Sequence, residues 1–389
     1  MGQNAAKSRS FTIWMIIFAA FAIVGVVCWV LQLMKGLQLT NLSVTNMWGL
    51  YITFFMIFTG IAAGSLFFAA VPYVFNLEDF KPYSRISAYV GAISSIVAAS
   101  LFIIVDIGNP ERAWLFITSG NFTSPMFWDF LMLLAYMVIS VIFTRQLILV
   151  HTGEKEEKSV KPIAFIALVA GVLVIVTSFV FAFQTARTLW NTPAQPISFL
   201  LAAFSVALAV LMIVGLILNK SGYIQMPVHL FGKMGKVAAL LLGIELAIVV
   251  IEVLVGLYPG GEEREALLWL VTGEGAVGFW LEIVALIGTI ILLGMKSSKT
   301  GSLLGGAITA LVAVYLIKSN LLQSELFHPL ISLPGPELYG NVTGPYIPSL
   351  LEIGLSLGII SLGALLFGLG LRVLNLGTKT NIDKKKIAS

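Results

Sequence analysis

Residues that could bind a polar ligand and exchange protons gather in two short segments of this chain, each directly after a long apolar run. The first contains Asp106, Asn109, Arg112 and Trp114, and the second contains Gln184, Arg187 and Trp190, while Asn46 and Trp48 stand before another apolar run. Carboxylate, amide and guanidinium groups beside tryptophans could fix the polar atoms of a ligand. A carboxyl group can also give or take a proton, and Arg112 or Arg187 could hold Asp106 ionised. The segments therefore predict a polar binding concavity with Asp106 as the first candidate for proton exchange, although aromatic belts and interfacial arginines alone could explain each residue singly.

A second set of acids lies inside apolar segments in the second half of the chain. It consists of Glu245, Glu252, Glu282 and Glu352. A charged side chain at mid-membrane costs about 2.5–3.5 kcal/mol, so such acids are expected to be protonated, paired or in contact with water. Glu245 and Glu252 are seven residues apart, which on a helix places both on one face about 10 Å apart along the axis. The set predicts a chain of proton sites, with hydrogen bonding between helices by neutral carboxyls as the structural alternative.

Cysteine and histidine are too scarce for most metal-based redox chemistry within this chain. Cys28 is the only cysteine, so the chain alone cannot form a disulfide, a cysteine-ligated zinc site or an iron–sulfur cluster. The three histidines, His151, His229 and His328, fall in predicted loops or at helix ends. None is placed to ligate a haem inside a helix bundle, so we expect no haem and no metal site.

Ten long apolar segments must position these residues, because they occupy most of the 389-residue chain. Hydrophobic residues make up 58% and charged residues only 11%, which is typical of a polytopic membrane protein. Runs of this length predict membrane-spanning helices and hence an all-α fold. The predicted spans are Phe11–Met34, Trp48–Phe75, Ile86–Val105, Met126–Val150, Pro162–Phe183, Pro196–Leu218, Val237–Leu257, Gly275–Met295, Gly301–Lys318 and Pro348–Leu374.

The distribution of basic residues predicts the orientation. Five of the 23 basic residues, Lys35, Arg112, Arg187, Arg264 and Lys318, fall on the side opposite both termini. Lysine and arginine concentrate in cytoplasmic loops, so both termini are expected in the cytoplasm and the protein in the cell (inner) membrane. The net charge of +4 reflects these anchoring residues, and the sequence offers no basic and aromatic surface that would bind nucleic acid.

An ordered series of short motifs resembles the NrfD-type membrane subunits of polysulphide reductase and its relatives. The series is Trp48-Gly49-Leu50-Tyr51, Gly60-Ile61-Ala62-Ala63-Gly64, Asp106 to Trp114, Ser124-Pro125-Met126 and Arg187-Thr188-Leu189-Trp190-Asn191-Thr192. It covers the predicted second to sixth helices. The resemblance implies two four-helix bundles flanked by a first and a last helix.

In function, the resemblance implies a membrane anchor that reacts with a quinone (menaquinone or ubiquinone) and holds no haem or iron–sulfur cluster of its own. Electrons would pass between the quinol and a ferredoxin-like iron–sulfur subunit on the outer face, which serves a catalytic, often molybdopterin, subunit. Asp106 and Arg187 would take part in the reaction. Where relatives carry a tyrosine near the outer end of the fifth helix, this chain has Thr177-Ser178-Phe179. The quinone site would then comprise Asn46, Trp48, Asp106, Asn109, Arg112, Trp114, Gln184, Arg187 and Trp190.

The expected organisation is a cytoplasmic N-terminus (1–10), a ten-helix membrane domain (11–374) and a basic cytoplasmic tail (375–389), with the bundles at 48–183 and 196–318. Outer loops Tyr258–Gly273 and Asn320–Ile347, with the turn-forming runs Pro259-Gly260-Gly261 and Pro334-Gly335-Pro336, would form a docking rim for partner subunits. Gly60 and Gly64 predict close helix packing. A proton-coupled secondary transporter is the alternative function, because buried glutamates also suit alternating access, and broken helices in both halves would favour it.

Overall fold

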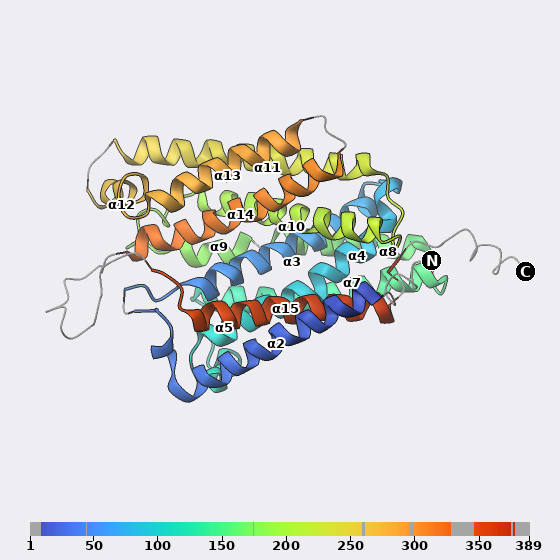
Figure 1. Ribbon diagram of the computed structural model, residues 1–389, viewed down its shortest axis with the longest axis horizontal. Helices are drawn as coiled ribbons and strands as arrows, with labels where there is room; N and C mark the ends of the chain where they lie inside the picture. Colours follow the sequence, from blue (N-terminus) through green and yellow to red (C-terminus); the bar gives the residue numbers. More distant parts are fainter. Residues whose placement is uncertain are drawn as a thin grey trace, which may run out of the picture.

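Among the residues that it describes, the computed structural model (Figure 1) has ten helices long and apolar enough to cross a membrane, which confirms the predicted all-α membrane fold. The structure describes residues 9–43, 45–173, 175–258, 261–295, 299–327, 346–374 and 376–377, and all regular elements among them are helices. Predictions for the extreme N-terminus, the basic tail, Pro259, His328 and the Pro334-Gly335-Pro336 turn fall wholly or largely outside these residues.

The spanning elements follow one another with short connections. They are α2 (Arg9–Lys35), α3 (Leu50–Val74), α4 (Lys81–Tyr89) continued by α5 (Ile96–Asp106), α7 (Pro125–Thr152), α8 (Val160–Val172) with α9 (Ile175–Ala182), α10 (Gln195–Lys220), α11 (Val228–Gly256), α13 (Ala276–Gly294), α14 (Thr300–Leu326) and α15 (Leu350–Val373). Two short helices, α6 (Leu115–Thr118) and α12 (Glu262–Val271), lie in connections.

Contacts divide the inner helices into two groups that meet along one seam. In the first group α3 packs against α4, α5 and α8, and in the second α10 packs against α11 and α14 while α13 packs against α11 and α14. The seam is the contact of α3 with α10. A Cβ on Gly64 would lie 2.8 Å from the carbonyl oxygen of Ala203, so only glycine allows the two backbones to approach this closely. This is the packing role predicted for the Gly60 and Gly64 pair.

The first and last spanning helices run side by side along one flank of the molecule (Figure 1). They meet at two glycines, because a Cβ on Gly25 would lie 2.6 Å from the Cα atom of Gly358. Most of α2 is exposed in the isolated chain, as expected for a helix that faces lipid. The pair therefore flanks the two groups rather than joining either.

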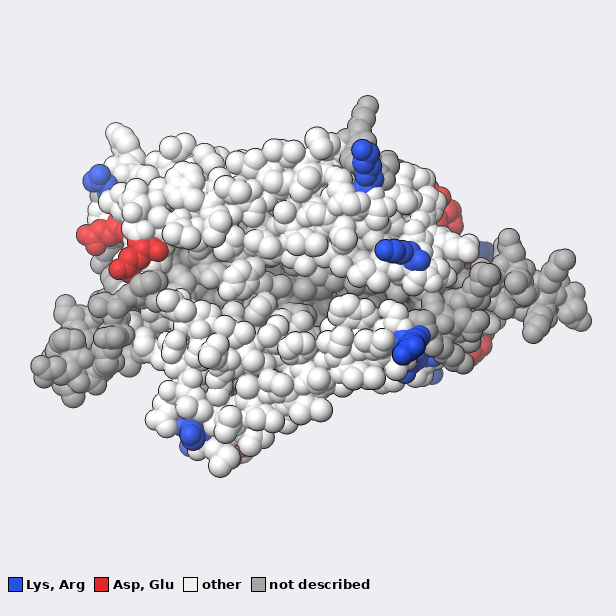
Figure 2. All heavy atoms as spheres, in the orientation of Figure 1, with Lys and Arg blue, Asp and Glu red and all other residues white. Residues whose placement is uncertain are grey.

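Two ends of the molecule can be distinguished by the segments they carry. The terminus end holds the start of α2 and the end of α15, and the loop end holds residues 36–43, 45–49, 107–124, 183–194 and α12 (Figure 1). On the face shown in Figure 2, charged side chains concentrate toward these two ends and the wide band between them carries almost none. Such a band matches the hydrocarbon layer of a membrane.

Several predicted boundaries were wrong, and each error has a physical reason. The ninth span does not end at Lys318 but continues to Leu326, because Lys318 and Glu325 face the protein interior and a helix carries them there without losing its backbone hydrogen bonds. The loop Tyr258–Gly273 contains α12, since acidic residues at its start favour a helix N-terminus and strong helix formers such as Ala266 and Leu267 follow. The third span starts at Glu78 rather than Ile86.

Two irregularities interrupt the first helix group. Residues Val90–Ser95 form a π-helical turn. Within this turn, Gly91 lies close against α3, because a Cβ added to it would be 2.7 Å from the carbonyl oxygen of Ala62. The fifth span is divided into α8 and α9 after a turn at Leu173. The fourth helix of the second group, α14, shows no such division along its 27 residues. Local π turns and helix breaks are common at functional sites, and both of these lie beside α3 or α7.

Candidate functional site

Residues predicted to form one polar cluster at the loop end separate into two groups in the structure. The first group surrounds Asp106 at the end of α5. Tyr51, which is fully buried at the start of α3, donates a hydrogen bond of 2.8 Å to the Oε1 atom of Gln32. The Nε2 atom of Gln32 donates in turn to the carbonyl oxygen of Val105, at 2.7 Å. This chain of hydrogen bonds fixes α2, α3 and α5 against one another directly beside Asp106.

Asp106 itself is partly buried and only partly satisfied. One carboxyl oxygen is shielded from solvent and has no hydrogen-bond partner among the described residues. Asp106 lies within electrostatic reach of Tyr51 and Glu352. Neither is a cation, and the ion pairs within 4.0 Å among the described residues involve only Lys81. The predicted pairing of Asp106 with Arg112 or Arg187 is therefore absent from the described part of the chain, and the buried carboxyl oxygen is left without a hydrogen-bond partner there.

Glu352, predicted as part of a proton path, has a capping role in the structure. It is the third residue of α15, where Ser349 and Glu352 form a reciprocal capping box that satisfies backbone N–H groups at the helix start. Its carboxylate also accepts from the backbone N–H of Asn41 at 3.0 Å and from the hydroxyl of Tyr346. Burial, together with the hydrogen bond to Glu352, raises the pKa of Tyr346 above its ordinary value. Glu352 thus ties the segment after α2 to the start of α15 and lies close to Asp106 rather than to the other glutamates.

The second group is centred on Arg187, in the connection between α9 and α10. The buried guanidinium donates a hydrogen bond to the carbonyl oxygen of Glu325 near the end of α14. The side-chain carboxylate of Glu325 accepts from the backbone N–H of Leu189 at 2.5 Å and from the hydroxyl of Thr188 at 3.4 Å. Burial lowers the pKa of Arg187, and the charge of Glu325 opposes that change. These bonds connect the 187–190 segment to the second helix group.

Aromatic rings bridge the space beside these groups. Trp48 stacks on Trp190 with ring centroids 5.8 Å apart, and Phe181 contacts the edges of both rings. The guanidinium of Arg187 lies 6.0 Å from the centre of the Trp190 ring, within the range of a cation–π contact. Asn46, which is buried just before Trp48, forms backbone bonds with Ser43 that shape this turn. The aromatic set forms an apolar wall between α3, α9 and α10.

Four predicted site residues do not join either group. Asn109, Arg112, Trp114 and Gln184 are exposed on the loop end. Asn109, Arg112 and Trp114 lie in or beside a 3-10 turn over Pro110–Arg112. Gln184 lies in the turns that follow α9. Because these four residues contact neither Asp106 nor Arg187 through a hydrogen bond among the described residues, they form a surface rather than a pocket.

A cavity of about 270 Å³ in the second helix group contains the other predicted acids. Glu245 and Glu252 both line it, as their spacing predicts, and Glu282 faces them from α13. The polar side chains that bond them are neutral. Ser198 donates to Glu245 at 2.5 Å, Thr192 to Glu252 at 3.3 Å and Asn320 to Glu282 at 2.7 Å. The second carboxyl oxygen of Glu245 has no hydrogen-bond partner among the described residues. Glu263 of α12 also lines the cavity, which therefore combines four titratable groups with enough space for water.

Lys318 is a further buried polar residue whose position was predicted wrongly. It was predicted as the last residue of the ninth span, on the side opposite the termini, but it lies inside α14 and is 3% exposed. Its ammonium lies 3.5 Å from the centre of the Phe199 ring, and its nitrogen has no hydrogen-bond partner among the described residues. Glu245 and Glu282 are within electrostatic reach. Continuing the apolar period of Gly301–Lys318 for two further helical turns could have indicated this interior position.

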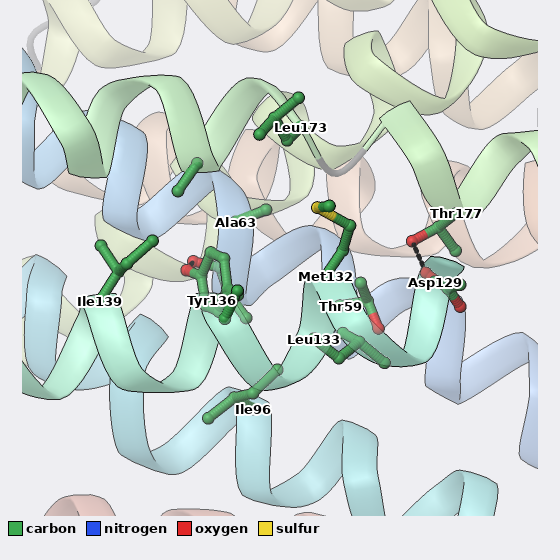
Figure 3. Close-up of a pocket in the computed structure, with 13 residues that line it drawn as sticks. Thr59, Ala63, Ile96, Asp129, Met132, Leu133, Tyr136, Ile139, Leu173 and Thr177 are labelled. Atoms are coloured by element: carbon green, nitrogen blue, oxygen red, sulfur yellow. Dashed lines mark hydrogen bonds between the residues drawn. The ribbon is translucent and has the colours of Figure 1, made fainter. Parts of the chain in front are cut away.

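A buried acid of the first helix group also received no role from the sequence. Thr177 of α9 donates a hydrogen bond of 2.6 Å to the carboxylate of Asp129 on α7, drawn as a dashed line in Figure 3. Both residues line a cavity of about 50 Å³, with Tyr136 and Thr59 also on its wall. Tyr136 donates to the carbonyl oxygen of Ala62 on α3. In each group, then, a buried acid on the third spanning helix of that group accepts a hydrogen bond from the fourth.

Comparison with known proteins identifies the family. The profile of polysulphide reductase, NrfD, matches residues 38–326, which is most of the chain. The chain belongs to the NrfD family. Among the described residues no group of three histidine, cysteine, aspartate or glutamate side chains is arranged to hold a metal ion.

NrfD relatives of similar length cover nearly all of the chain. A Halobacterium salinarum protein named as a dimethyl sulfoxide reductase membrane subunit is 28% identical over 93% of this chain and 91% of its own length. A selenate reductase subunit of Mesobacillus selenatarsenatis is 25% identical over 91% of each chain. The Hdr-like menaquinol oxidoreductase integral membrane subunit of Archaeoglobus fulgidus is 27% identical over 92% of this chain and 91% of its own.

The NrfD match includes the glutamate cavity, the Arg187 group and Asp106 with Tyr51, but not Gln32, Tyr346 or Glu352. Asp106, Arg187, Glu282 and Lys318 all fall between residues 38 and 326. Helices α2 and α15 both lie wholly outside the match. The family core therefore consists of the two helix groups, and Glu352 belongs to the flanking pair.

Proposed function

We propose that this NrfD protein is the membrane anchor and quinone-reactive subunit of a respiratory oxidoreductase complex, and that it exchanges electrons with an iron–sulfur subunit docked at its loop end. The observation that carries the proposal is the carboxyl oxygen of Asp106, which has no hydrogen-bond partner among the described residues and is buried where an apolar membrane region meets polar loops. The names of three relatives support it, since each is a subunit of a reductase or oxidoreductase, two are membrane subunits and one of these belongs to a menaquinol oxidoreductase.

The proposed quinone site lies between the two groups at the loop end. Oxidation of a quinol releases two electrons and two protons, so the site needs an acceptor for protons as well as a path for electrons. Asp106 accepts a proton at this buried carboxyl oxygen, with Tyr51 beside it as a second hydrogen-bonding group. Trp48 and Trp190 provide an apolar wall for the ring of the substrate. Asn46 shapes the turn that carries Trp48.

Arg187 does not hold Asp106 ionised in this proposal, although its charge suggested that role. Its guanidinium is already occupied by the carbonyl oxygen of Glu325 and by the face of Trp190. It therefore holds Trp190 in place as a positioning residue and supplies positive potential to the region. Thr177, which stands near where relatives are expected to carry a tyrosine, is bonded to Asp129 and does not reach this site.

The proposed partner surface is the loop end itself. Asn109, Arg112, Trp114 and Gln184 are exposed there, and α12, within a loop predicted as part of the docking rim, belongs to the same end (Figure 1). A mixture of amide, guanidinium and indole groups is typical of protein interfaces. A ferredoxin-like iron–sulfur subunit on this surface, serving a catalytic molybdopterin subunit, would receive or deliver the electrons. In this orientation the loop end faces outward and the termini lie in the cytoplasm of the cell.

The glutamate cavity is the proposed route for protons through this subunit. Glu245, Glu252 and Glu282 surround one space, so protons can pass among them by way of water. Glu352 is left out of this route because its carboxylate is occupied by the capping contacts at α15. The menaquinone or ubiquinone acts as the substrate, and the chain's own residues bind it and carry protons.

A proton-coupled transporter is the weaker alternative. The cavity acids would suit it, and the fifth span is broken, as transporter helices often are. The corresponding span of the second group, α14, is continuous, so the break is not repeated in the two halves. The relatives' names all concern reductases or oxidoreductases.

Photolabelling tests the proposed quinone site. The purified chain is irradiated with an azido-menaquinone or azido-ubiquinone, and the labelled peptides are identified by mass spectrometry. We expect labelling in the segments around Tyr51 and Asp106, with competition by excess unlabelled quinone. Labelling confined to the lipid-facing surface of α2, or insensitive to competitor, would contradict the proposed site.

A further inference from the structure

We infer that Lys318 forms a proton link between the two helix groups, exchanging protons with Glu245 or Glu282 on one side and, through a water held by Thr59 and Thr177, with Asp129 on the other. The inference deepens the proposed function, because it rests on proton movement through this subunit. It assigns a role to Lys318, Thr59, Thr177 and Asp129, none of which the proton route above includes.

The first observation is a small cavity in the seam between the groups. It has a volume of about 10 Å³, which is the space that one buried water needs. Its wall is largely apolar, but Thr59 of α3, Thr177 of α9 and Lys318 of α14 also line it. The cavity therefore touches both helix groups at a point where three polar side chains meet.

The second observation is that two of these side chains have polar atoms without hydrogen bonds. The hydroxyl of Thr59 and the ammonium of Lys318 are buried and have no hydrogen-bond partner among the described residues. A buried polar group left unpaired costs roughly 1–3 kcal/mol, and an ammonium more. A water needs two to four polar partners in its cavity. Thr59, Thr177 and Lys318 supply three, so one water would satisfy both unpaired groups.

On the first-group side, the link continues through a direct hydrogen bond to an acid. Thr177 donates to the carboxylate of Asp129 at 2.6 Å, and its oxygen can accept a further hydrogen bond from the water. Thr59 and Thr177 line both the seam cavity and the 50 Å³ cavity shown in Figure 3. Asp129 is thereby connected to the seam through a threonine hydroxyl and a shared cavity wall.

On the second-group side, Lys318 lies near two glutamates without being paired to either. Glu245 and Glu282 are within electrostatic reach, yet neither forms an ion pair within 4.0 Å of the ammonium. Glu245 also has an unpartnered carboxyl oxygen. Lysine has four rotatable side-chain carbons, so a small movement of its end can bring the nitrogen from the seam water to this oxygen. A lysine held permanently in an ion pair could not make that movement.

The chemistry balances at each step. The Lys318 ammonium gives a proton to the seam water while the water passes one, through the Thr177 hydroxyl that already donates to Asp129, to the Asp129 carboxylate, which becomes a carboxylic acid. The neutral Lys318 amine then takes a proton from the carboxyl group of Glu245 or Glu282, which becomes a carboxylate, and is an ammonium again. No electron moves, and a proton passes the other way once the Thr177 hydroxyl has turned to accept from Asp129 and donate to the water. Arginine could not replace lysine here, because a guanidinium does not lose its proton in a protein.

The test measures protons moved per electron by the purified complex in proteoliposomes, alongside quinol oxidation with an uncoupler present. Lys318→Arg keeps the charge and Lys318→Met removes it, and both should lower the ratio at least about twofold while uncoupled quinol oxidation changes less. Thr59→Val removes only the hydroxyl on the water and should lower the ratio as well. Thr289→Val is the matched control, since Thr289 is buried in α13 and bonds the carbonyl oxygen of Ala285.

The possible results separate the two proposals. A wild-type ratio retained in Lys318→Arg would show a fixed charge rather than a proton carrier and would overturn the inference while leaving the proposed function intact. A wild-type complex that oxidises quinol without moving protons would contradict the proton route itself. Should both Lys318 variants fail to assemble, Thr59→Val decides: an unchanged ratio overturns the link. A density map that resolves waters should show one between Thr59, Thr177 and Lys318, and a dry seam would also overturn it.

Discussion

Replacement of Asp106 by asparagine removes one proton-accepting group and almost nothing else. The change keeps the shape of the side chain, and the buried carboxyl oxygen accepts no hydrogen bond among the described residues that an amide would lose. Tyr51, Gln32 and Val105 remain bonded to one another beside the altered side chain. We therefore expect the stability of Asp106→Asn to change by less than about 1 kcal/mol.

The effect on quinol oxidation should be much larger. A positioned proton acceptor contributes about 10²- to 10⁴-fold to a rate, which corresponds to about 2.7–5.4 kcal/mol of activation free energy. The amide cannot take a proton at neutral pH, so this contribution is lost. Binding of the quinone ring should persist, because the wall formed by Trp48 and Trp190 is unchanged.

The assay is steady-state oxidation of a short-chain quinol by the purified complex, with an artificial electron acceptor. Glu111→Gln is the matched control, since Glu111 is an exposed acid in the same loop. Asp106→Asn should lower kcat with little change in KM, and Glu111→Gln should not change either. A fall of less than about threefold in Asp106→Asn would refute the assignment of the proton acceptor.

Three further predictions concern other parts of the molecule. Arg187→Ala should lower the melting temperature and the quinol oxidation rate together, because a charged hydrogen bond to Glu325 worth about 1.5–3 kcal/mol is lost. Arg264→Ala, at an exposed position of α12, should change neither the melting temperature nor the rate. Glu252→Gln should reduce protons moved per electron in proteoliposomes more than it reduces quinol oxidation, and an unchanged ratio would leave Glu252 as a structural hydrogen bonder. Gly64→Val should destabilise the detergent-solubilised protein by about 1–3 kcal/mol, since its side chain would meet Ala203, and a wild-type melting temperature would contradict the packing of the seam.

The sequence was sufficient to predict the number and type of spanning elements because the membrane allows few alternatives. Length and apolarity alone indicate helices, and the ten spanning helices found in the described part of the chain follow from that rule. The spacing of Glu245 and Glu252 likewise placed both on one cavity, since a helix repeats its faces every two turns in seven residues. Periodicity within a single helix is a local property, and a sequence displays it directly.

Contacts between helices could not be predicted in this way. Lys318 was taken for an interfacial anchor because charged residues usually end a span, and only the continuation of α14 to Leu326, with the ring of Phe199 against the ammonium, shows its interior position. Glu352 was taken for a proton carrier because it is an acid in an apolar helix, but its place in the first turn makes it a cap. Asp106 and Arg187 were expected together because both lie at one end, and their separation depends on which neighbours α3 and α14 bring to each.

The central claim is that electrons enter or leave the quinone pool at this chain. The most direct measurement is the paramagnetic resonance signal of the iron–sulfur subunit after addition of quinol to the purified complex, compared with the same partner subunits purified without this chain. We predict rapid electron exchange with quinol in the complete complex and none in the partners alone, while dithionite reduces both equally. Reduction by quinol at the same rate without this chain would contradict the claim.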